Sequence, residues 1–234
     1  MLLLGLDVET TGLDADSDRI IEIGAVLWDT ERKQPVKIFS EMIREPDVQE
    51  ISPLIEDITG ITYPMLQQFG LVPSGPLFQT LQWLMDRASY FVAHNAPFDR
   101  GFLTEFFLRN QENMPEKPWI DTIQDVPYPK KYKGRGLTYL AAEHGFINPF
   151  PHRAVTDVMT MLKVLSHYDV ELIAESALSP TLELTALVSY DDRDKAKNAG
   201  FRWDGGDKKW KMKIKKPAYN PENFDFKVEV VELG

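Results

Sequence analysis

The N-terminal segment runs from an apolar stretch directly into two carboxylates. Residues 2–8 are short and leucine-rich and are followed by polar residues, a pattern that predicts a buried strand. Asp7 and Glu9 lie two positions apart at its end, so the strand period of two directs both side chains to one face. Neighbouring carboxylates repel each other, and a hard divalent cation between them relieves that repulsion. A D-x-E triplet is also common on the polar face of ordinary strands, but here apolar residues continue up to Asp7.

Further apolar segments and helical spacings predict an α/β fold. We expect strands at 19–29, 36–44 and 90–93, and helices at 77–87, 98–109, 137–144 and 154–167. A weaker helical spacing follows Ser52-Pro53 and continues through Ile58, and 114–118 is expected to be a loop. Strands that come mainly first and helices that come mainly later indicate a sheet flanked by helices.

Composition excludes several classes of protein. A chain of 234 residues with 43% hydrophobic and 26% charged residues is globular, and its length suggests one large or two unequal domains. The lack of cysteine removes disulfides, thiolate zinc sites and cysteine nucleophiles, and it favours a reducing compartment, so we expect a cytoplasmic protein. No basic leader precedes the first strand and no apolar run approaches the ~18 residues of a membrane span, so no membrane partner is expected.

A second candidate segment, with a further carboxylate, follows the predicted strand at 90–93. Asp99, in the segment HNAPFD, falls in the opening turn of a helix, which places it at the same kind of strand-end edge as Glu9. An ordinary helix-start carboxylate, favoured by the helix dipole, explains Asp99 on its own. Likewise, His94 and Asn95 are explained as helix punctuation.

A third segment, PHRAVTD, contains a histidine and a carboxylate. His152 and Asp157 are five residues apart, which on one continuous helix would turn them roughly 140° from each other. Pro151 indicates instead that His152 precedes the helix on a loop, from which a movable imidazole can reach a site that Asp157 helps to form. His144 and His167 are interpreted as ordinary surface or core histidines.

Together, DVETTG, AHNAPFDRGFL and HRAVTD resemble the three sequence blocks of the DEDDh 3′-5′ exonucleases, the group of polymerase proofreading subunits, ribonuclease T and exonuclease X. The resemblance is strongest to exonuclease X, covers roughly residues 2–165, and extends to the connectors SPLIEDITGIT and WIDT. It implies a ribonuclease-H-like mixed sheet flanked by helices. It also implies that two divalent cations, Mg²⁺ or Mn²⁺, are held by Asp7, Glu9, Asp99 and Asp157, with His152 as general base.

The function implied by this resemblance is release of nucleoside 5′-monophosphates from the 3′ end of a nucleic acid, which we expect to be DNA. The same chemistry on RNA is the first alternative, because the contacts that recognise a 2′-hydroxyl cannot be identified from this sequence. A catalytically inactive nucleic-acid-binding module is a second alternative, and five intact acid and histidine positions argue against it. No polymerase-binding or clamp-binding peptide identifies a protein partner.

Two surfaces are candidates for substrate contact. By resemblance, the TTGL turn and a neighbouring amide recognise the terminal nucleotide through Thr10, Thr11, Gly12, Leu13 and Asn95. Leu13 would wedge against the terminal base, and packing of this leucine in the core is the alternative. The loop KKYKGRG provides further candidate phosphate or base contacts in Lys130, Lys131, Lys133 and Arg135, although an ordinary solvated loop explains them equally well.

Charge separates the C-terminal part from the rest. The chain carries a formal net charge of −10, of which 1–180 contribute −11 and 181–234 contribute +1. We therefore expect a nuclease domain at 1–180 and a small basic-faced α+β module at 181–234, with the seam near Ser179-Pro180. The segment just before this seam, 170–178, is compatible with a helix. Within the module, residues 193–216 hold ten basic and three acidic residues, a density that can neutralise phosphates.

Inside this module we expect a strand at 185–190, a helix at 191–199 stopped by Gly200, and a hairpin about Gly205-Gly206. The segment weakly resembles a small domain of unknown function found beside DNA-processing modules. The candidate nucleic-acid contacts are Lys208, Lys209 and Lys211, and a solvated charged face is the alternative. Trp203 and Trp210 are explained either as base-stacking residues or as the core of the hairpin.

Overall fold

The computed structural model describes residues 1–233 and divides into two compact units, Met1–Ile173 and a second that begins at Ala174. The first unit contains β1 (Leu2–Thr10), β2 (Ile20–Asp29), β3 (Gln34–Met42), α1 (Pro53–Thr59), α2 (Tyr63–Phe69), α3 (Gly75–Arg87), β4 (Tyr90–Ala93), α4 (Ala96–Arg109), β5 (Trp119–Asp121), α5 (Leu137–Glu143) and α6 (Ala154–Leu165). Helix α7 (Val170–Leu178) spans the division. The second unit contains β6 (Thr181–Leu187), α8 (Arg193–Asn198), β7 (Arg202–Asp204), β8 (Lys209–Lys215), the short 3₁₀ turns η1 (Lys216–Ala218) and η2 (Pro221–Asn223), and β9 (Lys227–Leu233).

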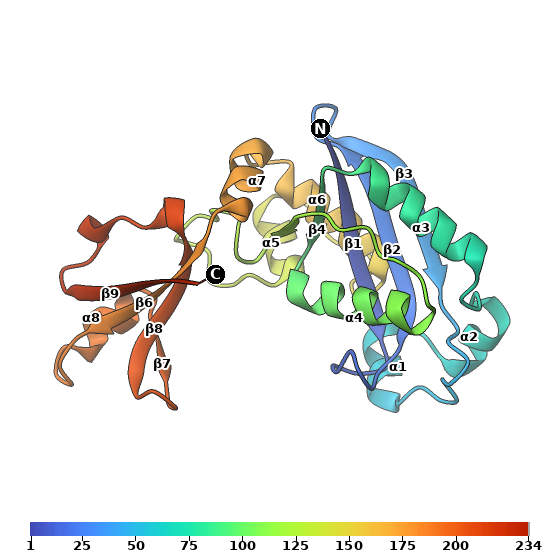
Figure 1. Ribbon diagram of the computed structural model, residues 1–234, viewed down its shortest axis with the longest axis horizontal. Helices are drawn as coiled ribbons and strands as arrows, with labels where there is room; N and C mark the ends of the chain where they lie inside the picture. Colours follow the sequence, from blue (N-terminus) through green and yellow to red (C-terminus); the bar gives the residue numbers. More distant parts are fainter. Residues whose placement is uncertain (234) are drawn as a thin grey trace. The chain divides into compact units, whose positions relative to one another are not determined.

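The first unit is built on a mixed sheet of five strands in the order β3-β2-β1-β4-β5 (Figure 1). The pairs β1–β2 and β2–β3 are antiparallel, whereas β1–β4 and β4–β5 are parallel. The predicted ribonuclease-H-like mixed sheet flanked by helices is therefore confirmed. Because β1 is central and parallel to β4, the C-terminal end of β1 meets the end of β4, from which α4 begins.

Helices cover both faces of this sheet (Figure 1). On one face, alternate residues of β1 such as Leu4 and Leu6 pack with α3 and α4, including Phe78 and Phe106, in the main hydrophobic core. On the other face, α6 contacts β1 and β2. The strand period of two therefore separates Leu4, Leu6 and Val8 from Asp7 and Glu9, which point to the α6 side.

A glycine on β2 allows α6 to lie directly on the sheet. A Cβ atom at Gly24 would lie 2.5 Å from the backbone carbon of Ala154, so only glycine leaves room for the start of the helix. Gly5 on β1 has the same role further along, since a Cβ there would lie 2.7 Å from Val158 Cγ1. These two close approaches bring the first turn of α6 next to the end of β1.

Most elements lie where the sequence predicts them, with two additions in the first unit. Helix α2 and strand β5 were not predicted, because seven and three residues are too short to establish a periodicity. Helix α7 confirms the helical interpretation of 170–178. The expected domain boundary at 180/181 falls between α7 and β6, whereas the compact units divide within α7 itself.

The second unit is a four-stranded antiparallel sheet in the order β7-β8-β6-β9. Helix α8 packs on one of its faces, where Ala196 and Phe201 join Leu184 and Met212 in a small core. The α+β module and the hairpin between β7 and β8 are thus confirmed. The predicted strand at 185–190 was misplaced, since β6 runs from Thr181 to Leu187, and β9 was not predicted at all.

Within residues 1–233, none of the helices combines the length and the apolar character needed to cross a lipid bilayer.

Candidate active site

Three carboxylates from two elements converge at the end of β1. Asp7, Glu9 and Asp157 each bring an oxygen atom into a group whose members all lie within 4.8 Å of one another. Asp7 pairs across the sheet with Gly24, and the start of α6 sits on that glycine, so Asp157 in the first helical turn lies beside Asp7. We call these three residues the acidic cluster.

The fourth predicted carboxylate, Asp99, lies behind this cluster. It is only 2% exposed, and its Oδ1 accepts a hydrogen bond of 3.1 Å from the backbone N–H of Val8, the residue between Asp7 and Glu9. The parallel pairing of β1 with β4 extends to Gly5 and Val92, and Asp99 supplies the acceptor for β1 beyond that point. Asp99 is not one of the residues within the 4.8 Å group, but it is close enough for its charge to act on Asp7.

The electrostatics of the site are those of like charges held together. Burial, followed by the charges of Asp99 and Glu9, raises the pKa of Asp7 well above its usual range. Burial and the charge of Asp157 raise the pKa of Glu9 to about 8. Burial also raises the pKa values of Asp99 and Asp157. The donor atoms are all carboxylate oxygens, and the chain places little positive charge beside them. Such a set is chemically suitable for binding hard divalent cations.

An ion pair between the buried Glu22 and the partly exposed Arg153 fixes the start of α6 against the sheet. Glu22, directly opposite Glu9 in the β1–β2 ladder, is 2% exposed. Its carboxylate accepts hydrogen bonds from the Arg153 guanidinium at 2.6 Å and from the backbone N–H of Ala154 at 2.9 Å. Sequence reasoning did not identify this pair, although a lone glutamate within the apolar run RIIEIGAV was a signal that it has a partner.

The turn before α6 wraps around Asp157. The side-chain amide of Asn148 donates to Asp157 Oδ1, and the backbone N–H of His152 donates to Oδ2 at 2.9 Å. Asn148 is 4% exposed and its own carbonyl accepts the Phe150 N–H at 3.1 Å, so the amide is fixed on both sides. Asn148 was missed from the sequence because its role depends on this turn geometry.

His152 precedes α6 on this turn, as predicted. Its backbone adopts φ 62°, and its side chain is exposed. The backbone N–H therefore holds Asp157 while the imidazole remains free to face an incoming group.

The TTGL turn is an ordered loop held by its own side chains. The Thr10 hydroxyl donates to the Gly12 carbonyl at 2.5 Å, and the Thr11 hydroxyl donates to Asp18 at 3.1 Å. A Cβ at Gly12 would lie 2.4 Å from the Asp18 carboxylate, which explains the glycine. Leu13 is 88% exposed, so the alternative that it packs in the core is wrong.

Two arginines anchor the remainder of this loop through backbone carbonyls. Arg109 from the end of α4 donates to the carbonyl of Ala15 at 3.1 Å, and Arg19 donates to that of Asp18 at 2.8 Å. Both arginines also pair with the buried Glu45. Leu13 is therefore an exposed side chain on a rigid support.

Asn95 and His94 have different surroundings. Asn95 is exposed at φ 90°, and its N–H donates to Asp121 Oδ1 at 3.2 Å. His94 has partners for both ring nitrogens, the Thr122 hydroxyl at 2.8 Å and the Arg135 carbonyl at 2.7 Å. His94 therefore ties three segments together, which agrees with its interpretation as a structural residue.

The predicted basic loop at 130–136 begins beyond β5 and is joined to the end of β4 by the His94–Arg135 contact. Its three lysines are exposed, and the Arg135 guanidinium stacks 4.8 Å above the Tyr128 ring. Tyr139 also holds the loop, because its hydroxyl accepts a hydrogen bond of 3.1 Å from the backbone N–H of Lys133. The structure thus displays these cations on an anchored loop.

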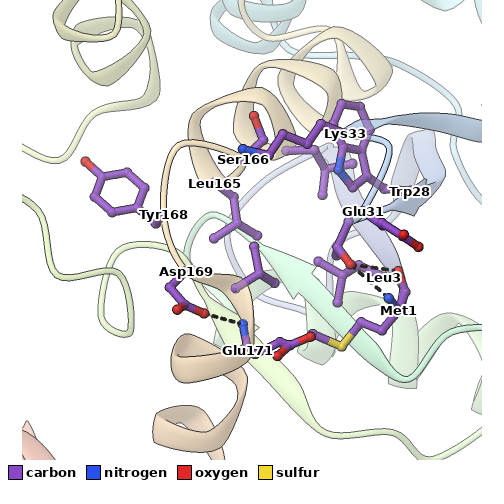
Figure 2. Close-up of a pocket in the computed structure, with 13 residues that line it drawn as sticks. Met1, Leu3, Trp28, Glu31, Lys33, Leu165, Ser166, Tyr168, Asp169 and Glu171 are labelled. Carbon is purple, nitrogen blue, oxygen red and sulfur yellow. Dashed lines mark hydrogen bonds between the residues drawn. The ribbon is translucent and has the colours of Figure 1, made fainter.

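A pocket of about 340 Å³ lies elsewhere in the first unit (Figure 2). Met1 and Leu3 from the start of β1 and Leu162 and Leu165 from the end of α6 contribute to its lining. These are the opposite ends of both elements from the acidic cluster, so the pocket is separate from the candidate active site.

Comparison with known proteins agrees with the geometry. A family model described as Exonuclease matches residues 4–165, and a model described as Domain of unknown function (DUF8626) matches 182–231. The chain belongs to this exonuclease family. The 3′-5′ exonuclease DinG of Staphylococcus aureus (strain USA300) is 32% identical over 195 residues, which cover 80% of this chain. The same match covers 20% of DinG, so the chain spans about one fifth of that relative.

Solved structures share the fold. Escherichia coli exonuclease I in complex with a dT13 oligonucleotide has a TM-score of 0.62 at 17% identity, over 79% of this chain and 48% of that one. The nuclease domain of 3′hExo, a DEDDh family member bound to rAMP, has a TM-score of 0.58 at 16% identity, over 71% of this chain and 90% of that one. Exonuclease X in complex with 5′ overhanging duplex DNA has 0.51 at 21% identity, over 74% and 98%. These likenesses show a shared fold, and membership of the exonuclease family rests on the family model and the DinG match.

Proposed function

We propose that the protein is a metal-dependent 3′-5′ exonuclease that shortens DNA from its 3′ end and releases nucleoside 5′-monophosphates. The observation that carries the proposal is the convergence of Asp7, Glu9 and Asp157 within 4.8 Å, with Asp99 buried behind them. Family membership and the DinG match support the reaction class.

The four carboxylates would hold two divalent cations, Mg²⁺ or Mn²⁺. The donor set fits, because it consists of carboxylate oxygens whose pKa values are raised by burial and, to a smaller extent, by neighbouring negative charges. Bound cations would polarise the scissile phosphate and stabilise the charge that develops on the attacking and leaving oxygens. Glu22 and Arg153 keep the start of α6, and therefore Asp157, in place against β1.

His152 is the proposed general base. An imidazole exchanges a proton readily near neutral pH, and that of His152 is exposed next to Asp157. In this role an imidazole nitrogen accepts the proton of the attacking water as the new phosphorus–oxygen bond forms. The bond from phosphorus to the 3′-oxygen of the preceding nucleotide breaks in the same step, and that oxygen leaves as a 3′-hydroxyl after it takes a proton from solvent. Because the backbone N–H of His152 is bonded to Asp157, the histidine moves its ring without releasing the carboxylate.

The TTGL turn is the proposed end-recognition surface. Leu13 is exposed on a loop that Arg19 and Arg109 hold rigid, so its contact with the terminal base costs little ordering on binding. The Thr10 and Thr11 hydroxyl protons are engaged within the loop, so we expect these residues to shape the backbone around Gly12 rather than donate to the substrate. Asn95 and the lysines of the basic loop are proposed as additional contacts to the strand.

The test is hydrolysis of 5′-labelled single-stranded DNA, duplex DNA and single-stranded RNA of one sequence in Mg²⁺. A 3′-5′ exonuclease produces a ladder that shortens one nucleotide at a time, whereas attack from the 5′ end releases the label at once. If RNA is cleaved faster than both DNA substrates, the preferred substrate is RNA and the exoribonuclease alternative holds. Absence of cleavage in Mg²⁺ and Mn²⁺ would support the inactive binding module instead. A cytoplasmic location stays a prediction.

A further inference from the structure

Strand β8 in the second unit displays a row of lysines on one face of its sheet. Lys209, Lys211, Lys213 and Lys215 alternate with Trp210, Met212 and Ile214, which pack in the core with α8. Strand parity therefore places all four lysines on the face opposite that core. At a rise of about 3.3 Å per residue, the row extends over about 20 Å.

Neighbouring strands add charges to this face through their register. Arg202 pairs with Lys211 across β7–β8, and Lys227 lies on the same face of β9. The acidic residues of this face are Asp204, Glu183 and Glu229, so six cations face three anions. We call this surface the lysine face.

The cations of the lysine face are not equivalent. Lys211 forms ion pairs with Glu183 at 3.5 Å and Asp204 at 3.7 Å and a further pair with Asp207, so its single charge is shared among three carboxylates. Lys215 donates to the carbonyl of Ala177 at 2.9 Å. Arg202, Lys209 and Lys213 are exposed. Lys209 lies opposite Asp204 and Lys213 lies opposite Glu183 in the ladders, so the positive character of the face comes from its surplus of cations, six against three anions on the strands.

We propose that the lysine face binds the phosphate backbone of a single-stranded nucleic acid. A line of separated cations matches a chain of evenly repeated phosphates, and ammonium groups act on phosphates as point charges that do not distinguish bases. Trp203, which is 54% exposed, lies on the opposite parity beside Trp210, so base stacking on this tryptophan is not part of the face. The choice of a nucleic acid as partner rests on the proposed nuclease function.

Binding at this face would serve the nuclease through tethering. A strand held by the second unit stays at high local concentration for the first unit, which gains avidity without new contacts at the active site. The acidic first part, with a net charge of −11, gives little electrostatic attraction for a polyanion by itself. The lysine face would provide the electrostatic attraction for the strand that the first part lacks.

The test measures binding of the full chain in EDTA, where cleavage does not interfere. The triple variant Arg202→Gln, Lys209→Gln, Lys213→Gln is compared with a matched control on α8, Arg193→Gln, Lys195→Gln, Lys197→Gln. Fluorescence anisotropy with labelled dT30 and rU30 is recorded at several salt concentrations. Thermal melting verifies that both variants fold like the parent.

The lysine-face variant is expected to lose on the order of 10²-fold in affinity at 0.1 M salt, and the slope of log K against log salt should fall by about 2, since each single-strand phosphate contact contributes about 0.7. The control should keep affinity within about threefold, because its cations lie on the other side of the sheet. Equal loss in both variants, an unchanged slope, or a tenfold preference between dT30 and rU30 would overturn the proposal.

The same variants separate this proposal from the proposed function. Hydrolysis of a dinucleotide, which is too short to reach along the row, should continue at the parental rate in the lysine-face variant. If the lysine-face variant hydrolyses the dinucleotide at the parental rate and its salt slope is unchanged, the lysine-face proposal is wrong and the proposed nuclease function stands. If the salt slope is reduced in the lysine-face variant but the parent protein cleaves no substrate, the lysine-face proposal is supported and the proposed nuclease function is wrong.

Discussion

The two units manage charge in opposite ways. In the first, Asp7, Glu9 and Asp157 converge with no cation among them, and Arg153 acts on Glu9 while it is paired with Glu22. In the second, Lys211 is surrounded by three carboxylates, so its charge is satisfied within the fold. The contrast indicates that the first unit holds buried carboxylates close together with little positive charge beside them, whereas the second unit places a cation among its carboxylates.

The largest expected effect comes from removing one member of the acidic cluster. Asp7→Asn should lower cleavage by on the order of 10⁴-fold or more, because the loss of a cation ligand removes several kcal/mol of transition-state stabilisation. In EDTA the same variant should unfold at a higher temperature than the parent, since one source of repulsion is gone. Cleavage assays in Mg²⁺ and thermal melts in EDTA measure the two effects.

The matched control is Asp57→Asn on α1, where the carboxylate is exposed. It should change neither cleavage nor melting. Full cleavage by Asp7→Asn would remove the contrast between the units, because the acidic cluster would then be an ordinary acidic surface.

Loss of the imidazole should have the next largest effect. His152→Ala is expected to reduce the rate by on the order of 10² to 10⁴, the usual contribution of a general base. His167→Ala, an exposed histidine beyond the end of α6, is the control and should retain its activity. Single-turnover rates across pH distinguish a lost base from weakened substrate binding. A decrease of less than tenfold excludes His152 from this role.

A smaller effect is expected from the amide that orients Asp157. Asn148→Ala should increase the Mg²⁺ concentration needed for half-maximal cleavage by about 10- to 100-fold, because outer partners of metal ligands typically contribute that much to affinity. The rate at saturating Mg²⁺ should recover substantially. Cleavage rates measured over a range of Mg²⁺ and of Mn²⁺ concentrations, for this variant and for the exposed control Asn113→Ala, measure the shift. An unchanged Mg²⁺ requirement would show that the turn holds Asp157 without the amide.

The smallest effect is on stability and follows from Glu9. Its pKa is raised from 4.5 to about 8, so in the metal-free protein its contribution to folding is fully present below about pH 4.5 and is lost as the pH rises through about 8. Denaturant unfolding in EDTA across this range should therefore show a downward slope that Glu9→Gln reduces. Mg²⁺ should remove the difference. An identical pH profile for parent and variant would mean that burial and the neighbouring charges do not raise the pKa of Glu9.

The sequence predicted the positions of the site residues better than their supports. The shared face of Asp7 and Glu9 follows from strand parity and the loop position of His152 from Pro151, because these inferences depend on neighbours along the chain. Asn148 and the Glu22–Arg153 pair depend on contacts across 9 and 131 residues, which no local pattern encodes. The same reason explains β9, a strand that exists through pairing with β6.

Gly24 gives the acidic cluster its dimensions. Since the backbone of α6 rests on this residue, the opening between Asp157 and Asp7 is set by main-chain contact and not by the reach of a flexible side chain. A methyl group at this position would push the helix away from the sheet and increase the distance between the carboxylates of Asp7 and Asp157. The separation of these two carboxylates therefore depends on the absence of a side chain at Gly24.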